Sequence, residues 1–391
     1  MRKNYDVIVV GGGPAGSRAA KHAAAGGARV LVLEKDREVG APVRCAEGVG
    51  DVGLRYIARP GELKIRWIAQ TITGLRFVAP DGNAVEIHHQ LGYVLNRKQF
   101  DYDMAVEAAD AGAEIITKAC VTGLLFEDGF VTGVTANILG KEINLNSRIV
   151  IGADGVESRV GRWAKLRSHF DMHDLETCAQ VTAANVDVKP DMAYFYFGTN
   201  LAPGGYAWIF PKGGGVANIG LGISGDYSGR TSPQNYLQRF LEKHFPNVSI
   251  LTSVVGGVPC ARALKKLSGN GVMLVGDAAH QSNPVSGGGL IRALVAAQIA
   301  GGVAAEAIRK NDVSRNVLQK YDKEWYRGEG RTHNLFYRLK EGIFKLTDEE
   351  LNKTAVALNR LEPDKRNLVE MFKTALVSQP RLILDAIKVF L

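Results

Sequence analysis

Two apolar runs of about five residues, separated by glycine-rich turns, characterise the first part of the chain. Residues 6–10 (DVIVV) are followed by GGGPAG and by the alanine-rich residues 17–25, and residues 29–33 (RVLVL) follow two further glycines. Short apolar runs rich in β-branched side chains are typical of buried strands, whereas the alanine-rich stretch favours a helix. The order strand, tight turn, helix, strand predicts the start of a doubly wound α/β unit.

The middle of the chain alternates apolar and polar positions. Residues 74–88 form two alternating runs around the turn sequence PDGN, which predicts a β-hairpin. Four more strand-like segments follow, at residues 182–188, 193–197, 206–210 and 216–223. Together they predict an antiparallel sheet inserted between pieces of the first unit.

The chain from Arg309 onward is expected to be helical and carries an excess of Lys and Arg over Asp and Glu. The terminal sequence RLILDAIKVFL places Ile383, Ile387 and Phe390 on one helical face. Such a face suits either a membrane interface or packing on the protein's own domain, and the pattern fits both equally.

The first glycine turn has the composition and the setting of a dinucleotide-binding loop. Gly11 allows a sharp turn, Gly13 lets the backbone approach a pyrophosphate, and Gly16 lets helix and strand pack closely. The N–H groups at the start of the following helix face the phosphate charge. Glu34 ends the second strand about 20 residues later, where a carboxylate accepts hydrogen bonds from ribose hydroxyls. This spacing predicts a bound dinucleotide but leaves FAD and NAD open.

Two later strands end in similar turns, at residues 149–155 (IVIGADG) and 271–277 (GVMLVGD). Each alone is an ordinary strand-to-turn transition, but in this order they resemble the fingerprints of the para-hydroxybenzoate hydroxylase-like flavoproteins. The resemblance implies FAD, with Asp277 on the ribityl chain and Asp154 ordering the flavin site. By the same resemblance Gly288, Gly289 and Leu290 begin a long helix whose positive end lies at the flavin pyrimidine edge.

Two further motifs narrow the resemblance: PVRCAEG at residues 42–48 and PGGYAWIFP at residues 203–211, which matches the pattern PxxYxWxFP. Over most of residues 1–320 the chain is similar to the geranylgeranyl reductases, and among them to the archaeal digeranylgeranylglycerophospholipid reductases. The resemblance fades over the C-terminal part. It implies that FAD is contacted by Ala15, Glu34, Cys45, Ala46, Gly48, Arg97, Val121, Asp277, Gly289 and Leu290.

These interpretations give an α/β fold in which an FAD-binding, doubly wound parallel sheet is interleaved with an antiparallel-sheet substrate domain. We assign residues 1–72, 97–165 and 270–320 to the FAD-binding domain, and residues 73–96 and 166–269 to the substrate domain. Residues 321–391 form the C-terminal helical part.

Tyr206, Trp208 and Phe210 alternate and so point to one face of a strand. Without the family resemblance, a stripe of aromatic side chains packed in the core is the more common explanation. With it, Tyr206 and Trp208 are expected to wall a pocket for an isoprenoid chain. Cys45 either packs as a small buried side chain or controls access to the flavin and supplies a proton. Cys45, Tyr206 and Trp208 are the catalytic candidates. Glu47, His280 and Tyr206 are further candidate proton sources, which the sequence does not rank.

The resemblance implies a reductase that transfers hydride from reduced FAD to C=C bonds of geranylgeranyl chains in prenyl ether phospholipids. Two other functions stay open: an FAD-dependent aromatic monooxygenase on the same fold, and a non-catalytic, flavin-bearing lipid-binding protein. No second GxGxxG unit indicates a separate nicotinamide domain. Electrons are therefore expected from transiently bound NAD(P)H or from a ferredoxin-type carrier.

A net charge of +8 favours an anionic partner, either a phosphate-bearing substrate or an acidic membrane surface. Nucleic acid is not expected, because the basic residues form no block. The four cysteines lie far apart without a CxxC pair, so no metal site is expected. The start of the chain does not resemble a signal peptide, and no apolar run reaches bilayer-spanning length. We therefore expect a cytoplasmic protein with peripheral membrane contact.

Overall fold

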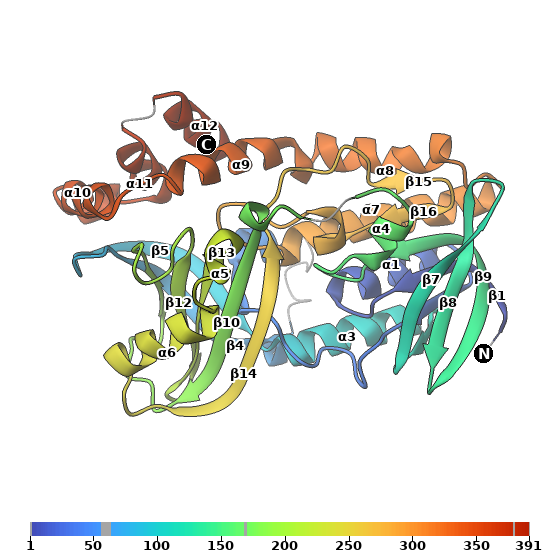
Figure 1. Ribbon diagram of the computed structural model, residues 1–391, viewed down its shortest axis with the longest axis horizontal. Coiled ribbons are helices and arrows are strands. Elements are labelled where there is room, and N and C mark those ends of the chain that lie inside the picture. The colour runs from blue at the N-terminus through green and yellow to red at the C-terminus, as the bar shows by residue number, and fades with distance from the viewer. Residues whose placement is uncertain (1, 56–63, 168–169, 378–379, 391) are drawn as a thin grey trace.

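Two eight-stranded sheets and a group of C-terminal helices make up the computed structural model, which describes residues 2–55, 64–167, 170–377 and 380–390 (Figure 1). The first sheet has the order β15-β16-β9-β1-β2-β6, and β8 and β7 extend it from β9. From β16 to β6 all neighbouring strands are parallel, which confirms the parallel sheet expected from the apolar runs. Its strands are β1 (Asn4–Val10), β2 (Val30–Leu33), β6 (Glu114–Ile116), β7 (Ala119–Glu127), β8 (Phe130–Ile138), β9 (Lys141–Gly152), β15 (Ser268–Gly269) and β16 (Val272–Leu274).

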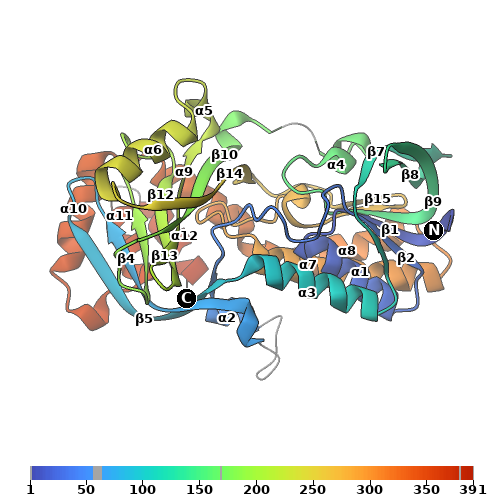
Figure 2. The ribbon, with the colours of Figure 1, turned by 90° about the horizontal axis from the view of Figure 1, so that it is seen from below.

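Small side chains allow the helices of this unit to pack closely. The predicted alanine-rich helix is α1 (Pro14–Ala25), which packs against both α3 (Arg97–Asp110) and α7 (Leu290–Arg309) (Figure 2). A side chain on Gly301 of α7 would collide with the backbone of α1. Among the described helices, α7 is the one long and apolar enough to cross a bilayer. Its alanines are buried in the core of the first sheet, which accounts for this composition.

The second sheet has the order β14-β10-β13-β12-β11-β4-β5-β3. All neighbouring strands are antiparallel except β11 and β4, which pair in parallel. The predicted hairpin at residues 74–88 is confirmed as part of the longer pair β4 and β5. The strands are β3 (Gly48–Gly50), β4 (Ile68–Val78), β5 (Ala84–Leu95), β10 (Leu175–Ala184), β11 (Met192–Tyr196), β12 (Tyr206–Gly213), β13 (Val216–Ser224) and β14 (Ser249–Pro259).

One predicted strand was placed too late in the chain. The strand expected at residues 182–188 is β10, which begins at Leu175 and ends at Ala184. Asn185 has a φ of +61°, a left-handed conformation that turns the chain out of the sheet. Strands β3 and β4 also begin before residue 73, and the domain limits themselves stay a prediction.

The C-terminal helices lie over one end of the second sheet (Figure 1): α9 (His333–Ile343), α10 (Asp348–Asn359), α11 (Leu368–Ala375) and α12 (Pro380–Phe390). Helix α12 packs on α9, where Ile383 joins a small core with Leu339 and Ala386. Leu384, on another side of α12, is 59% exposed. The helix therefore packs on its own domain through Ile383, and the side chain of Phe390 lies outside the described part of the chain.

The remaining elements are short or flank the sheets. They are α2 (Asp51–Arg55), α4 (Arg159–Trp163), α5 (Gly225–Ser228), α6 (Pro233–His244), α8 (Arg315–Arg327), and the 3₁₀ turns η1 (Ile65–Trp67), η2 (Met172–Asp174), η3 (Gly276–Ala279), η4 (Glu329–Thr332) and η5 (Pro363–Lys365). Helix α6 covers the core of the second sheet with Leu237 and Phe240.

Candidate functional site

The opening glycine turn packs against the turn after β9. Gly11 has a φ of +103°, and a side chain there would collide with the carbonyl of Ala153. A side chain on Gly16 would collide with the carbonyl of Gly11. Gly13, in contrast, has no atom within 4 Å of the place where a Cβ would lie. The turn is therefore closed on its protein side and open in front of Gly13, at the start of α1, as a bound pyrophosphate requires.

Glu34 is held at the end of β2 beside this turn. Its Oε2 accepts a hydrogen bond from the Gly12 N–H at 2.7 Å, and its Oε1 accepts one from the Asp36 N–H at 2.8 Å. Each carboxylate oxygen keeps a second acceptor position, which suits a ribose hydroxyl. The Ala119 N–H donates to the Glu34 carbonyl at 2.9 Å, so β7, with the buried Val121, begins next to Glu34.

The late Gly–Asp turn meets the opening turn from the other side. A Cβ on Gly276 would lie 3.2 Å from the Cβ of Ala15, and one on Gly289 would lie 3.3 Å from Oδ1 of Asp277. That Oδ1 also accepts a hydrogen bond from the Ser282 hydroxyl at 2.8 Å. Burial raises the pKa of Asp277, and the positive charge of Arg97 partly opposes this shift. The fold thus brings these predicted FAD contacts together from distant parts of the sequence.

Asp154 is buried in the turn after β9. Its Oδ2 accepts a hydrogen bond from the Val160 N–H at 2.9 Å, which orders the start of α4 as an ordinary helix cap would. Its Oδ1 is buried and has no hydrogen-bond partner among the residues that the structure describes. Burial also raises the pKa of this carboxyl. An unpaired buried oxygen beside the opening turn fits a site completed by a bound cofactor.

The loop that carries Cys45 is tied to the second sheet by polar side chains. The Gln180 side chain donates to the Cys45 carbonyl at 3.0 Å and accepts from the indole N–H of Trp208 at 3.0 Å. The Asn218 side chain donates to the Ala46 carbonyl at 3.2 Å. A Cβ on Gly48 would lie 2.6 Å from the ring of Phe210. This loop, here called the Cys45 loop (residues 42–48), therefore lies directly against the aromatic strand β12.

Glu47 is the polar centre of the Cys45 loop. Its carboxylate pairs with Lys212, accepts from the Asn218 side chain at 2.6 Å, and accepts from the Arg97 N–H at 2.9 Å. The Arg97 guanidinium makes two hydrogen bonds to Asp101, at 2.7 and 2.9 Å. Burial disfavours the charge on Arg97, but the acidic groups around it, Asp101 foremost and Glu47 among them, together outweigh burial and raise its pKa. Arg97 thus joins α3 to the Cys45 loop.

Tyr206, Trp208 and Phe210 form an aromatic wall together with Phe195 of β11. The ring centroids of Phe195 lie 5.7 Å from Tyr206 and 5.5 Å from Phe210, and those of Tyr206 and Trp208 lie 6.0 Å apart. The Tyr206 hydroxyl donates to the carbonyl of Ser286 at 2.6 Å. Because Ser286 precedes the glycines that lead into α7, the wall is fixed next to Gly288, Gly289 and Leu290.

The three candidate proton sources named from the sequence have different surroundings in the structure. Burial lowers the pKa of His280 to about 4, so its imidazole is neutral at pH 7. The Glu47 carboxylate has three partners: it accepts hydrogen bonds from the Arg97 N–H and the Asn218 side chain, and it is paired with the Lys212 ammonium. Burial raises the pKa of the Tyr206 hydroxyl well above its usual value. Neither the neutral His280 imidazole nor the Tyr206 hydroxyl with its raised pKa is a group that releases a proton readily near neutral pH.

Sequence reasoning missed three residues that shape this site: Gln180, Lys212 and Asn218. All three are polar positions within or at the end of strands of the second sheet, and Gln180 and Asn218 are buried. Asn218 interrupts the otherwise apolar run VANIGLGIS, and this interruption was the one signal available from the sequence. Their common target, the Cys45 loop, is known only once the sheet has formed.

Comparison with known proteins agrees with this geometry. Two family models match the chain: an FAD binding domain over residues 6–91 and a geranylgeranyl reductase catalytic domain over residues 174–258. A digeranylgeranylglycerophospholipid reductase of Methanococcoides burtonii is 43% identical, with 100% of this chain and 97% of that protein aligned. A solved geranylgeranyl bacteriochlorophyll reductase-like protein from Thermoplasma acidophilum has a TM-score of 0.90 at 35% identity, covering 99% of this chain and 100% of that one.

A flavin-dependent brominase has a TM-score of 0.72 at 17% identity and covers 99% of both chains, so it shares the fold alone. The glycine turns fit FAD, and FAD is the cofactor that the matched domain and the relatives indicate. This chain is 43% identical to that reductase of Methanococcoides burtonii over its full length, and the matched catalytic domain covers β10 to β14. The chain therefore belongs to the digeranylgeranylglycerophospholipid reductase family.

Proposed function

We propose that this protein saturates C=C bonds of geranylgeranyl chains in prenyl ether phospholipids, with FAD bound between the opening glycine turn and the Gly–Asp turn. The observation that carries this proposal is the hydrogen bond from Tyr206 to Ser286, at 2.6 Å, which fixes the aromatic wall beside the start of α7. A wall of Tyr206, Trp208, Phe210 and Phe195 offers an apolar surface to an isoprenoid chain. Each methylene that moves from water to such a surface contributes about 0.8 kcal/mol.

Bound FAD supplies hydride, and the chain supplies position and environment. Gly13 would give the pyrophosphate room, Glu34 would accept a hydrogen bond from the ribose, and Asp277 would accept one from the ribityl chain. The aromatic faces exclude water and stabilise cationic character that develops on an alkene carbon as it is reduced. Gln180 holds the Cys45 loop beside this wall, because its side chain bonds both the Cys45 carbonyl and the Trp208 indole.

Anaerobic incubation of the dithionite-reduced protein with a geranylgeranylated phospholipid tests the function. We expect the lipid mass to rise by two hydrogens for each double bond, measured by mass spectrometry. An aromatic monooxygenase would instead require oxygen and would leave this lipid unchanged. A flavin-bearing lipid-binding protein would retain the lipid without any change of mass, and either result would contradict the proposal.

The electron donor is proposed to be NAD(P)H or a ferredoxin-type carrier that binds transiently. Anaerobic titration of the oxidised protein with NADPH, and separately with reduced ferredoxin, distinguishes the two. The physiological donor is the one that bleaches the flavin absorbance at a rate at least equal to lipid turnover. Bleaching by neither donor would contradict both assignments.

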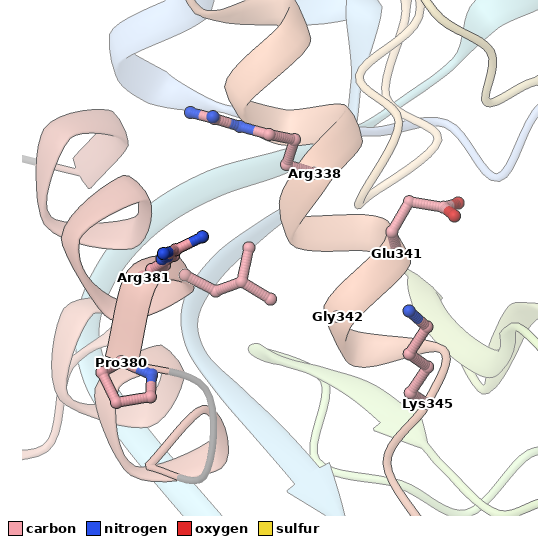
Figure 3. A pocket seen from close by; sticks show the side chains of 7 residues that line it. Arg338, Glu341, Gly342, Lys345, Pro380 and Arg381 are labelled. Atoms are coloured by element: carbon pink, nitrogen blue, oxygen red, sulfur yellow. The ribbon is translucent and has the colours of Figure 1, made fainter.

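We further propose that the protein is cytoplasmic and contacts the membrane peripherally through its C-terminal helices. A hollow of about 600 Å³ lies between α9 and α12, and its charged lining consists of three cations, Arg338, Lys345 and Arg381, and one acid, Glu341 (Figure 3). Leu384 is 59% exposed and follows Arg381 by three residues, about one turn of α12. Cations next to an exposed apolar side chain suit an anionic lipid surface.

Leu384→Asp is expected to weaken binding to acidic vesicles by about 10- to 100-fold, because burial of one leucine contributes about 1.5–3 kcal/mol and each 1.4 kcal/mol is about tenfold in affinity. Co-sedimentation with phosphatidylglycerol vesicles measures this. Leu139→Asp is the matched control, since Leu139 is 74% exposed in the turn between β8 and β9, at the far end of the molecule (Figure 1). Equal binding by both variants would argue against α12 as the contact.

A further inference from the structure

Glu176 is a buried carboxyl with no role in the site described above. Its exposed fraction is 8%, and neither carboxylate oxygen has a hydrogen-bond partner within the described ranges of the chain. An ionised carboxylate left unpaired in a protein interior is strongly disfavoured, whereas the protonated acid is neutral. The surroundings of Glu176 therefore decide whether it carries a proton.

Lys340 is the cation whose charge acts on Glu176, and its ammonium is already bonded to other groups. Lys340 is fully buried, and its ammonium bonds the carbonyls of His173 and Cys260, at 3.1 and 3.0 Å, and Asp174 at 3.2 Å. An ammonium has three N–H donors, so these three acceptors use them all. Lys340 acts on Glu176 only through its field and not by a hydrogen bond.

Burial raises the pKa of Glu176 to about 8, with Lys340 opposing this shift and Asp226 adding to it. Apart from these two charges, the titratable groups around it are neutral at pH 7, because burial raises the pKa of each. They are Cys178 on the same strand, Tyr206 on β12 and Cys260 just after β14. Glu176 thus holds its proton at neutral pH.

The position of Glu176 connects this proton to the aromatic wall. Glu176, Cys178 and Gln180 alternate along β10 and share one face. Gln180 on that face bonds Trp208, and a Cβ on Gly205, next to Tyr206, would lie 3.2 Å from Oε2 of Glu176. Gly222 lies between Cys178 and Tyr206 in the sheet register and carries no side chain to separate them.

We propose that Glu176 supplies the proton that alkene reduction consumes, an inference that rests on the proposed function. One alkene carbon gains a hydride from the reduced FAD. The neighbouring carbon forms its new C–H bond with the proton that leaves the Glu176 carboxyl. The resulting carboxylate regains a proton from water, so atoms and charge balance over the cycle.

The first test needs no turnover and follows thermal stability against pH. The folded protein keeps the Glu176 proton up to about pH 8, whereas the unfolded chain releases it near 4.5. This site therefore lowers folded-state stability progressively as pH rises from 4.5 to 8. The melting temperature of Glu176→Gln minus that of wild type is expected to rise over this window and then level off. A flat difference would overturn the proposal.

Glu127→Gln is the matched control, because Glu127 is exposed at the end of β7 and should give a flat difference. An infrared band of a protonated carboxyl at pH 7, absent only in Glu176→Gln, is the second expected signature. The FAD content of Glu176→Gln should equal that of wild type, which separates a missing proton from a damaged flavin site.

Single-turnover lipid reduction by the pre-reduced protein then tests the role. The rate of wild type should fall above about pH 8. Glu176→Gln should be slower by about 100-fold or more and should show no such fall in rate, as expected for loss of a general acid. Equal rates for wild type and Glu176→Gln would overturn the proton assignment alone. A wild-type protein that leaves the lipid unchanged would overturn the proposed function as well.

Discussion

Gly13→Ala is expected to weaken FAD binding by about 10- to 100-fold while leaving the fold intact. Gly13 has a φ of −66°, which alanine adopts freely, and a Cβ there meets no protein atom within 4 Å. The added methyl would instead occupy the space assigned to the pyrophosphate. Overpacking by one methyl group costs about 1–3 kcal/mol, and each 1.4 kcal/mol is about tenfold in affinity. Titration of the apoprotein with FAD measures the change.

Gly302→Ala is the control for this substitution. Gly302 is exposed in α7, and a Cβ there also meets nothing within 4 Å. In a helix interior this change is expected to stabilise the protein slightly, by about 0.5–1 kcal/mol, with FAD affinity unchanged. If Gly13→Ala bound FAD as tightly as Gly302→Ala, the pyrophosphate would not lie in front of the opening turn.

Arg97→Met is expected to lower the free energy of unfolding by about 3–5 kcal/mol, because it leaves Asp101 buried without its partner. The side chains of Arg97 and Asp101 are only 11% and 9% exposed and share two hydrogen bonds. Urea denaturation of the FAD-loaded and FAD-free protein measures the loss. A loss in both forms would show that Arg97 supports the fold as well as the cofactor site.

The neighbouring Lys98→Met removes a cation that is 60% exposed and paired with Glu38 at the surface. It should cost at most about 1 kcal/mol. The double variant Arg97→Met, Asp101→Asn removes both buried charges and should recover part of the stability lost in Arg97→Met. Equal losses for Arg97→Met and Lys98→Met would contradict the buried ion pair described here.

The parts of the fold that follow from local sequence were predicted well. The opening strand, glycine turn and helix depend on contacts between residues close in the chain, and each glycine has a steric reason visible in the sequence pattern. The strand at residues 182–188 was misplaced because its limits depend on pairing with β13 and β14, far along the chain, and on the left-handed turn at Asn185.

The site residues that came from motifs are brought together by the fold, although their individual roles stay predictions. Gln180, Asn218 and Glu176 were not found from the sequence, because each is an isolated polar residue inside a strand. Their roles depend on which residues the sheet register places next to them, such as Trp208 beside Gln180. A single sequence does not encode that register in any short pattern.

In the proposed reaction, electrons from the bound flavin pass to an alkene of a prenyl lipid. Anaerobic mixing of the fully reduced protein with a geranylgeranyl phospholipid, followed by absorbance and lipid mass together, tests it most directly. We expect oxidised-flavin absorbance to return without oxygen and one double bond to disappear for each flavin oxidised. A flavin that stays reduced in the presence of bound lipid would contradict it.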